Sequence, residues 1–135
     1  MGAPADPVYF EDARKAAHRN TWFRHVAFTG RYSQLVLMSI PPDDELGDEV
    51  HDAADQIFVV VEGEGDAIVV GKARQVNKND VAFVRAGAHH NIRNTAKDDL
   101  KLYVISSPPI HPEGTIHRTR EDAIGAMVSK RSVFV

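Results

Sequence analysis

The sequence predicts an all-β fold, a β-barrel or double-sheet jelly roll with short N- and C-terminal helices. Between residues 33 and 107, short runs rich in Val, Ile, Phe, Tyr and Leu alternate with clusters of Gly, Asn, Asp and Pro. Closely spaced short runs of this kind are typical of all-β proteins. Strands so short leave unpaired edges unless their sheet closes or stacks on another, which favours a barrel or a jelly roll.

The apolar runs predict strands at residues 33–40, 56–62, 66–70, 81–84, 90–93 and 100–106. The glycine-containing segments 63–65 and 71–72 predict hairpin connections, and Asn79-Asp80 predicts a turn. Alternating apolar residues such as Phe58 and Val60 are expected to belong to the core.

The segments that flank these strands predict short helices. Residues 11–19 are rich in Ala, Arg and Lys, and an aromatic strand is expected after them, around Trp22 and Phe28. Residues 120–127 predict the second helix. The 135 residues, 43% of them hydrophobic, are enough for one domain with its own core. We expect a single domain over 1–135, with a barrel core at about 31–107, an N-terminal helix and strand within 8–30, and a C-terminal wrap and short helix within 108–135.

Two C-terminal segments carry further expectations. Three prolines and a glycine exclude regular structure over residues 107–114, and this segment is expected to wrap the outside of the barrel. Residues 132–135 are apolar and β-prone, which predicts pairing with an exposed sheet edge. Together with the aromatic N-terminal segment, this end of the chain predicts a homodimer.

Composition excludes several classes of partner. The 16 basic and 19 acidic side chains give a formal net charge of −3, and no basic cluster predicts binding to nucleic acid. No apolar run approaches the roughly 20 residues of a membrane-spanning helix, and residues 1–6 lack the pattern of a signal peptide. We therefore expect a cytoplasmic protein without membrane contact. Because the chain has no cysteine, any metal ion must be held by nitrogen and oxygen.

Glu49 and His51 are the first candidate metal-binding residues along the chain. They are two positions apart, so in an extended segment their side chains leave the same face and can converge on one ion. Gln56 follows five residues after His51, at the start of an apolar strand, and His90 opens a later strand shortly after Gly87.

These positions resemble the two motifs of the cupin superfamily, in particular its small single-domain bacterial members. Residues 47–65 resemble the first motif, in which HxH precedes an acidic ligand and a strand that ends in glycine. Residues 85–94 resemble the second motif, PxGxxH with an Asn four residues later. The resemblance, aligned on Gly63, implies that Glu49, His51, Gln56 and His90 hold one divalent metal ion.

Three positions depart from the motifs. Glu49 stands for the first histidine, Gln56 for the usual glutamate, and Arg85 for the usual proline. These departures affect the identity of the metal and not the fold. Two imidazoles and a carboxylate suit Fe(II), and Mn, Ni and Zn accept the same donors.

Plainer interpretations of the same residues stay open. In a metal-free barrel, His51 and His90 would be hydrogen-bonded histidines. Glu49 would be a solvated carboxylate in the acidic run 43–49, and Gln56 would be a polar residue without a ligand role. A slip of one residue would put His89 in the place of His90, because neighbouring residues of a strand face opposite sides.

The leading functional hypothesis is a metal-dependent enzyme that acts on a small oxygen-rich substrate, such as a carboxylate, a sugar acid or a hydroxy-carbonyl compound. The reaction would be oxygen activation, as in a dioxygenase, or Lewis-acid isomerisation, as in an isomerase or lyase. Tyr103 and Arg93 are candidate catalytic residues, because a phenol and a guanidinium near a metal can donate a proton or orient an anion. The alternatives are a non-catalytic sensor or binding module for a small molecule, and a purely structural barrel.

Overall fold

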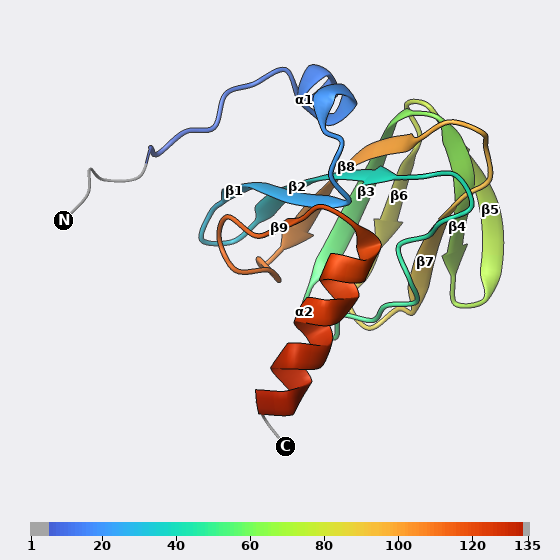
Figure 1. Cartoon of the computed structure of the whole chain (residues 1–135). Coiled ribbons are helices and arrows are strands. Elements are labelled where there is room, and N and C mark those ends of the chain that lie inside the picture. The colour runs from blue at the N-terminus through green and yellow to red at the C-terminus, as the bar shows by residue number, and fades with distance from the viewer. Residues whose placement is uncertain (1–5, 134–135) are drawn as a thin grey trace.

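The computed structural model describes residues 6–133, with side chains up to Met127. Within this range, strands and two helices follow one another along the chain (Figure 1). The helices are α1 (Ala13–Arg19) and α2 (Arg120–Val133). The strands are β1 (Arg24–Thr29), β2 (Gln34–Ile40), β3 (Asp55–Glu62), β4 (Glu64–Val69), β5 (Lys72–Asn77), β6 (Val81–Val84), β7 (His90–Asn94), β8 (Leu100–Ser107) and β9 (Ile116–His117).

The strands form two antiparallel sheets, which confirms the predicted double-sheet jelly roll. The larger sheet has the order β6-β3-β8-β2-β1-β9, and the smaller has the order β5-β4-β7. One core cluster joins both sheets, because it contains Phe58 and Val104 from the larger and Ala67 and Ile92 from the smaller. Side chains alternate between the faces of a strand, so these inward positions fill the space between the sheets.

All six strands predicted in the barrel core are present, and β5 is an additional strand that the pattern did not predict. Its sequence, KARQVN, holds one buried residue, Val76. β5 pairs with β4 over its whole length, through a turn at Val70 and Gly71 whose φ angles are 49° and 76°. Two positive φ angles in succession are typical of a tight two-residue hairpin. A strand with one face in solvent and few apolar residues gives little sequence signal.

The connection at residues 63–65 is not a hairpin, and this prediction was wrong. β3 pairs with β6 and β8 in the larger sheet, whereas β4 pairs with β5 and β7 in the smaller one. Gly63, with a φ angle of 90°, turns the chain from one sheet to the other. A Cβ atom on Gly65 would collide with the carbonyl oxygen of Arg93, so this corner requires glycine for close packing.

Helix α1 covers the outer face of the larger sheet (Figure 1). Asp12 begins the helix, because its side chain accepts a hydrogen bond of 3.0 Å from the Lys15 amide. Ala17 then packs in a small outer cluster with Leu37 and Val61, and Tyr103 lies against it. The outer face of β8 is therefore a packing surface for the N-terminal helix.

The segment between β8 and α2, which was expected to wrap around the outside of the barrel, is fastened to β2. Gln34, which is buried, anchors it: the Gln34 Nε2 atom donates to the His111 carbonyl at 2.8 Å, and the His111 amide donates to Gln34 Oε1 at 3.2 Å. The chain then adds the short strand β9 to the edge of β1. These bonds place His111 beside the barrel interior.

Helix α2 is longer than predicted and replaces the β segment expected at the C-terminal end. Its first turn is capped by Thr119, whose Oγ1 accepts a hydrogen bond of 3.1 Å from the Asp122 amide. Ser132 and Val133 belong to this helix, so the prediction of a β segment was wrong for these two residues, and Phe134 and Val135 lie outside the described residues. Over residues 6–133, no helix has the length and hydropathy needed to cross a membrane.

Candidate metal centre

Glu49 and His51 lie in the loop that joins β2 to β3, and backbone hydrogen bonds fasten this loop to β7. The amides of Glu49 and His90 each donate to the carbonyl of the other at 2.9 Å, which makes an isolated antiparallel bridge. The Gly47 amide also donates to Asn91 Oδ1 at 2.9 Å. Residues directly opposed in such a bridge have neighbouring Cβ atoms, so the bridge sets Glu49 beside His90.

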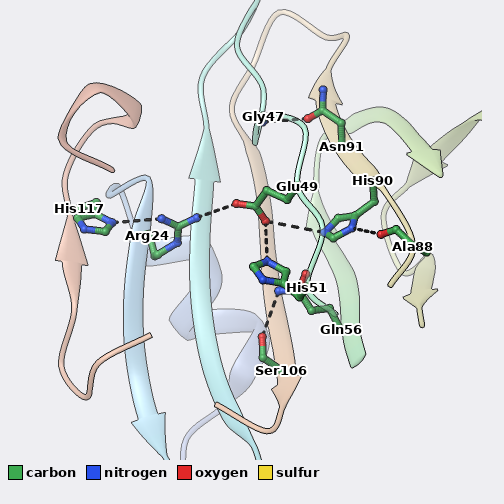
Figure 2. Close-up of polar contacts among 10 residues, drawn as sticks. All are labelled: Arg24, Gly47, Glu49, His51, Gln56, Ala88, His90, Asn91, Ser106 and His117. Carbon is green, nitrogen blue, oxygen red and sulfur yellow. Dashed lines mark hydrogen bonds and ion pairs between the residues drawn. The ribbon is translucent and has the colours of Figure 1, made fainter. Parts of the chain in front are cut away.

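The side chains of Glu49, His51 and His90 converge (Figure 2). One potential ligand atom from each lies within 4.8 Å of those of the other two. The Glu49 Oε2 atom is 3.2 Å from His51 Nε2 and 3.8 Å from His90 Nε2. Among the described residues, the structure thus brings together the carboxylate and the two imidazoles that the sequence singled out.

Two buried side-chain atoms at this centre, His90 Nε2 and Gln56 Oε1, have no hydrogen-bond partner among the described residues. The Nδ1 atom of His90 lies 3.0 Å from the Ala88 carbonyl. A carbonyl can only accept, so Nδ1 donates to it, and in the neutral ring the lone pair is then on Nε2. Gln56 Nε2 donates to Ser106 Oγ at 3.2 Å, which leaves the amide oxygen free (Figure 2).

Unpartnered buried acceptors are rare, and a metal-binding histidine commonly donates its other N–H group to a carbonyl. Two imidazoles, a carboxylate and an amide oxygen are also an accepted donor set for first-row divalent metals. Glu49, His51 and His90 could therefore hold a divalent ion.

Arg24 and His117 complete the polar surroundings, and sequence reasoning missed both. Arg24 is 7% exposed. Its Nη2 atom lies 3.6 Å from Glu49 Oε1, and its Nη1 atom lies 3.2 Å from His117 Nδ1. A signal for Arg24 exists in the sequence, because the two-residue alternation of β1 that buries Val26 also turns Arg24 inward.

Charges at the centre favour an ionised Glu49. Burial raises the pKa of Glu49, but the hydrogen bond from His51, the positive charge of Arg24 and the charge that the two histidines carry when protonated outweigh burial and hold the pKa below its ordinary value. Burial lowers the pKa of the Arg24 guanidinium, and the Glu49 charge opposes this effect. Glu49 is thus held as the anion that a dication requires.

A pocket of about 560 Å³ opens beside the centre. Arg24, Glu49 and His51 form its polar wall, and the segment before β9 and helix α2 form the rest. His111 and His117, which the sequence suggested to be surface or packing residues, both line this pocket. The pocket gives a small molecule access to the candidate ligands.

Three other residues considered from the sequence lie away from the centre. Tyr103 packs on the outer face of the larger sheet, beside the cluster under α1. Arg93 points away from the core and donates from Nε to Glu45 Oε2 at 3.0 Å. The side chain of His89 is 67% exposed, near Asp48. The structure therefore places His90 at the centre in preference to His89, and it does not bring Tyr103 or Arg93 there.

The pKa of His111 predicts a pH dependence of stability. Burial and the nearby Arg24 charge lower this pKa from 6.5 to about 4. Between these values the unfolded chain binds a proton that the folded chain excludes, so stability falls as pH falls from 6.5 to 4. In metal-free wild-type protein, this proton is expected to lower the free energy of unfolding by about 2–3 kcal/mol across this window. His111→Gln is expected to remove that loss, as measured by urea unfolding at a series of pH values.

The matched control for this measurement is His89→Gln, which makes the same substitution at an exposed surface position. This control is expected to lose stability between pH 6.5 and 4 as the wild type does. Equal losses in the wild type and in His111→Gln would contradict the prediction.

Known proteins match this combination of fold and site. A family model of the cupin domain matches residues 36–106, more than half of the chain, including Glu49, His51, Gln56 and His90. The chain belongs to the cupin family. The crystal structure of BH2720 from Bacillus halodurans is similar with a TM-score of 0.86 and 34% identity, over 89% of this chain and 95% of that one.

Two curated relatives extend the comparison. YrkC of Bacillus subtilis is 37% identical over 119 residues, which are 83% of this chain and 63% of YrkC, so the chain spans less than two thirds of that relative. A protein of Thermotoga maritima named oxalate-binding protein is 31% identical over 68 residues, which are 50% of this chain and 56% of that protein.

Proposed function

We propose that this protein is a metal-dependent cupin enzyme that acts on a small oxygen-rich anion, by oxygen activation or by Lewis-acid isomerisation. One divalent ion, Fe, Mn, Ni or Zn, would be held by Glu49, His51 and His90, with Gln56 as a fourth ligand. The observation that carries this proposal is the pair of buried, unpartnered lone pairs on His90 and Gln56, next to an ionised Glu49 and an open pocket.

A bound divalent ion would supply Lewis acidity, which polarises a substrate oxygen. The chain supplies the remaining parts. Glu49 gives one negative charge to the centre, and the proton on His90 Nδ1 fixes the ring so that Nε2 faces inward. Arg24 adds a positive charge on the pocket wall. This combination favours anionic substrates over neutral ones.

A second candidate function is non-catalytic binding of a small carboxylate. The relative named oxalate-binding protein favours it. The placement of Tyr103 and Arg93 away from the centre also supports it, because both candidate catalytic side chains make their contacts elsewhere. The binding module would use the metal, or merely the cavity, to hold its ligand, and turnover separates the two candidates.

The test loads the protein separately with Mn, Fe, Ni and Zn and presents a panel of small carboxylates, sugar acids and hydroxy-carbonyl compounds. Binding is followed by calorimetry and turnover by product analysis. Turnover that requires metal and disappears in His51→Ala supports the enzyme, provided that the control His89→Ala keeps it. Binding without turnover supports the second candidate. A protein that binds no metal would overturn the enzyme, and one that in addition binds none of these compounds would overturn both.

Several sequence-based expectations stay predictions. They are a cytoplasmic location, a homodimer and the single-domain organisation of residues 1–135. The homodimer no longer draws support from a β segment at residues 132–133, because these residues are helical.

A further inference from the structure

The pocket beside the metal centre has two chemically different walls. Its polar lining consists of Arg24, Glu49 and His51 together with His111, Thr115 and His117, and its other lining side chains are apolar. The apolar side chains come from the segment before β9 and from helix α2, namely Ile110, Pro112, Ala123, Ala126 and Met127. The centre thus lies beside a cavity in which the side chains lining it from Ile110, Pro112 and helix α2 carry no charge.

We infer that the substrate or ligand is an amphipathic carboxylate, with its anionic head between Arg24 and the metal ligands and an apolar chain against α2. This inference rests on the proposed metal centre and names the class of molecule that the site takes. Separate observations support the anionic head of the ligand and its hydrocarbon chain.

The anionic head is supported by the unusual position of Arg24. Its guanidinium is buried, and the Nε atom has no hydrogen-bond partner. Within the described part of the chain, the carboxylate that it pairs with is Glu49, at 3.6 Å. An ion held by Glu49 would share that carboxylate's charge, which leaves the guanidinium without full compensation in a buried site, and a guanidinium matches the geometry of a carboxylate with paired N–H donors.

The size of the pocket supports a ligand with an apolar hydrocarbon chain. At about 560 Å³ it falls within the usual range of sites for ligands of drug size, roughly 300–1,000 Å³. A water molecule takes about 30 Å³, so a two-carbon dicarboxylate of six heavy atoms would leave most of the cavity filled by water against apolar side chains. A chain of several carbons would displace that water, which is favourable.

The test measures the binding of straight-chain 2-oxo acids of four, six and eight carbons, and of oxalate, to the full-length protein loaded with Zn. Calorimetry gives Kd without dependence on turnover. Each added methylene is expected to tighten binding about fourfold until the pocket is full. The eight-carbon acid is expected to bind far more tightly than oxalate.

Two matched variants examine the apolar wall. Ala126→Asp places a carboxylate in the pocket from an exposed helix position and is expected to remove the gain in affinity with chain length. Gly125→Asp adds the same charge one residue away, at a position that does not line the pocket, and is expected to keep the gain.

Variants of Arg24 examine the head. Arg24→Lys and Arg24→Gln are expected to weaken the binding of every acid by a similar factor, about tenfold or more. The gain in affinity per added methylene should stay the same. Zn content is measured for each variant, so that an effect on metal binding is separated from an effect on the acid.

The outcomes are distinguishable. Protein that binds no Zn overturns the proposed metal centre and this inference with it. Zn-loaded protein whose affinity does not rise with chain length, or which prefers oxalate to the longer acids, overturns the inference and leaves the metal centre standing.

Discussion

Replacing His51 and His90 together by alanine is expected to abolish metal binding. A structural zinc site contributes on the order of 10 kcal/mol, or about 2.5 kcal/mol for each of four ligands. Losing two ligands should cost about 5 kcal/mol, which is a factor of more than 10³ in affinity. Elemental mass spectrometry of untagged protein, purified without chelator and after reconstitution, measures the stoichiometry. The wild type should hold about one ion per chain, and the double variant almost none.

The matched control is the double variant His18→Ala and His89→Ala, which removes two histidines whose side chains are 65% and 67% exposed. It should keep the wild-type metal content. Chelator should also lower the thermal stability of the wild type, because an ion that binds the folded chain stabilises it. The thermal stability of the double variant of His51 and His90 should not change on adding chelator. Equal metal content in the wild type and in the variant at the centre would contradict the assignment.

The strands and the ligand positions could be predicted because both are expressed in local sequence patterns. β3 and β8 are rich in β-branched and apolar residues. Residues of these types favour strands over other secondary structure. Glu49 and His51 are separated by one residue, so their common face follows from strand geometry. The pairing of this loop with His90, 39 positions along the chain from His51, came from the family resemblance, and the backbone bridge explains it.

The rest of the site could not be predicted, because it depends on which segments meet in space. Arg24 is one arginine among many in the sequence, and its role follows from the packing of β1 beside the loop of Glu49. His111 reaches the pocket through its bonds to Gln34, a residue 77 positions away. Contacts of this kind leave no periodic signal.

Tyr103 shows where the sequence held more information than the prediction used. It lies between Leu102 and Val104, which both belong to the core. Because strand residues alternate between faces, core neighbours on both sides place Tyr103 on the outer face, against α1. Arg93 follows the same logic beside Ile92, a core residue. Alternation could thus have separated both residues from the interior.

Phe58→Ala is expected to produce the largest loss of stability among single core substitutions near the site. The Phe58 side chain is 2% exposed in the main core cluster, and removing a buried phenylalanine costs about 3–5 kcal/mol. Urea unfolding of metal-free protein measures this loss without a contribution from the ion. The same substitution at Phe10, which is 92% exposed, should change stability by less than about 0.5 kcal/mol.

The same variant should also weaken metal binding, although Phe58 offers no ligand atom. Its ring centroid lies 5.6 Å from that of His90, so the ring forms part of the wall that holds the imidazole in place. A cavity there lets His90 rotate away from Glu49, and loss of support around a ligand typically costs 10–100-fold in metal affinity. Full metal affinity in Phe58→Ala, together with the expected loss of stability, would show that the Ala88 hydrogen bond and the bridge to Glu49 are enough to orient His90.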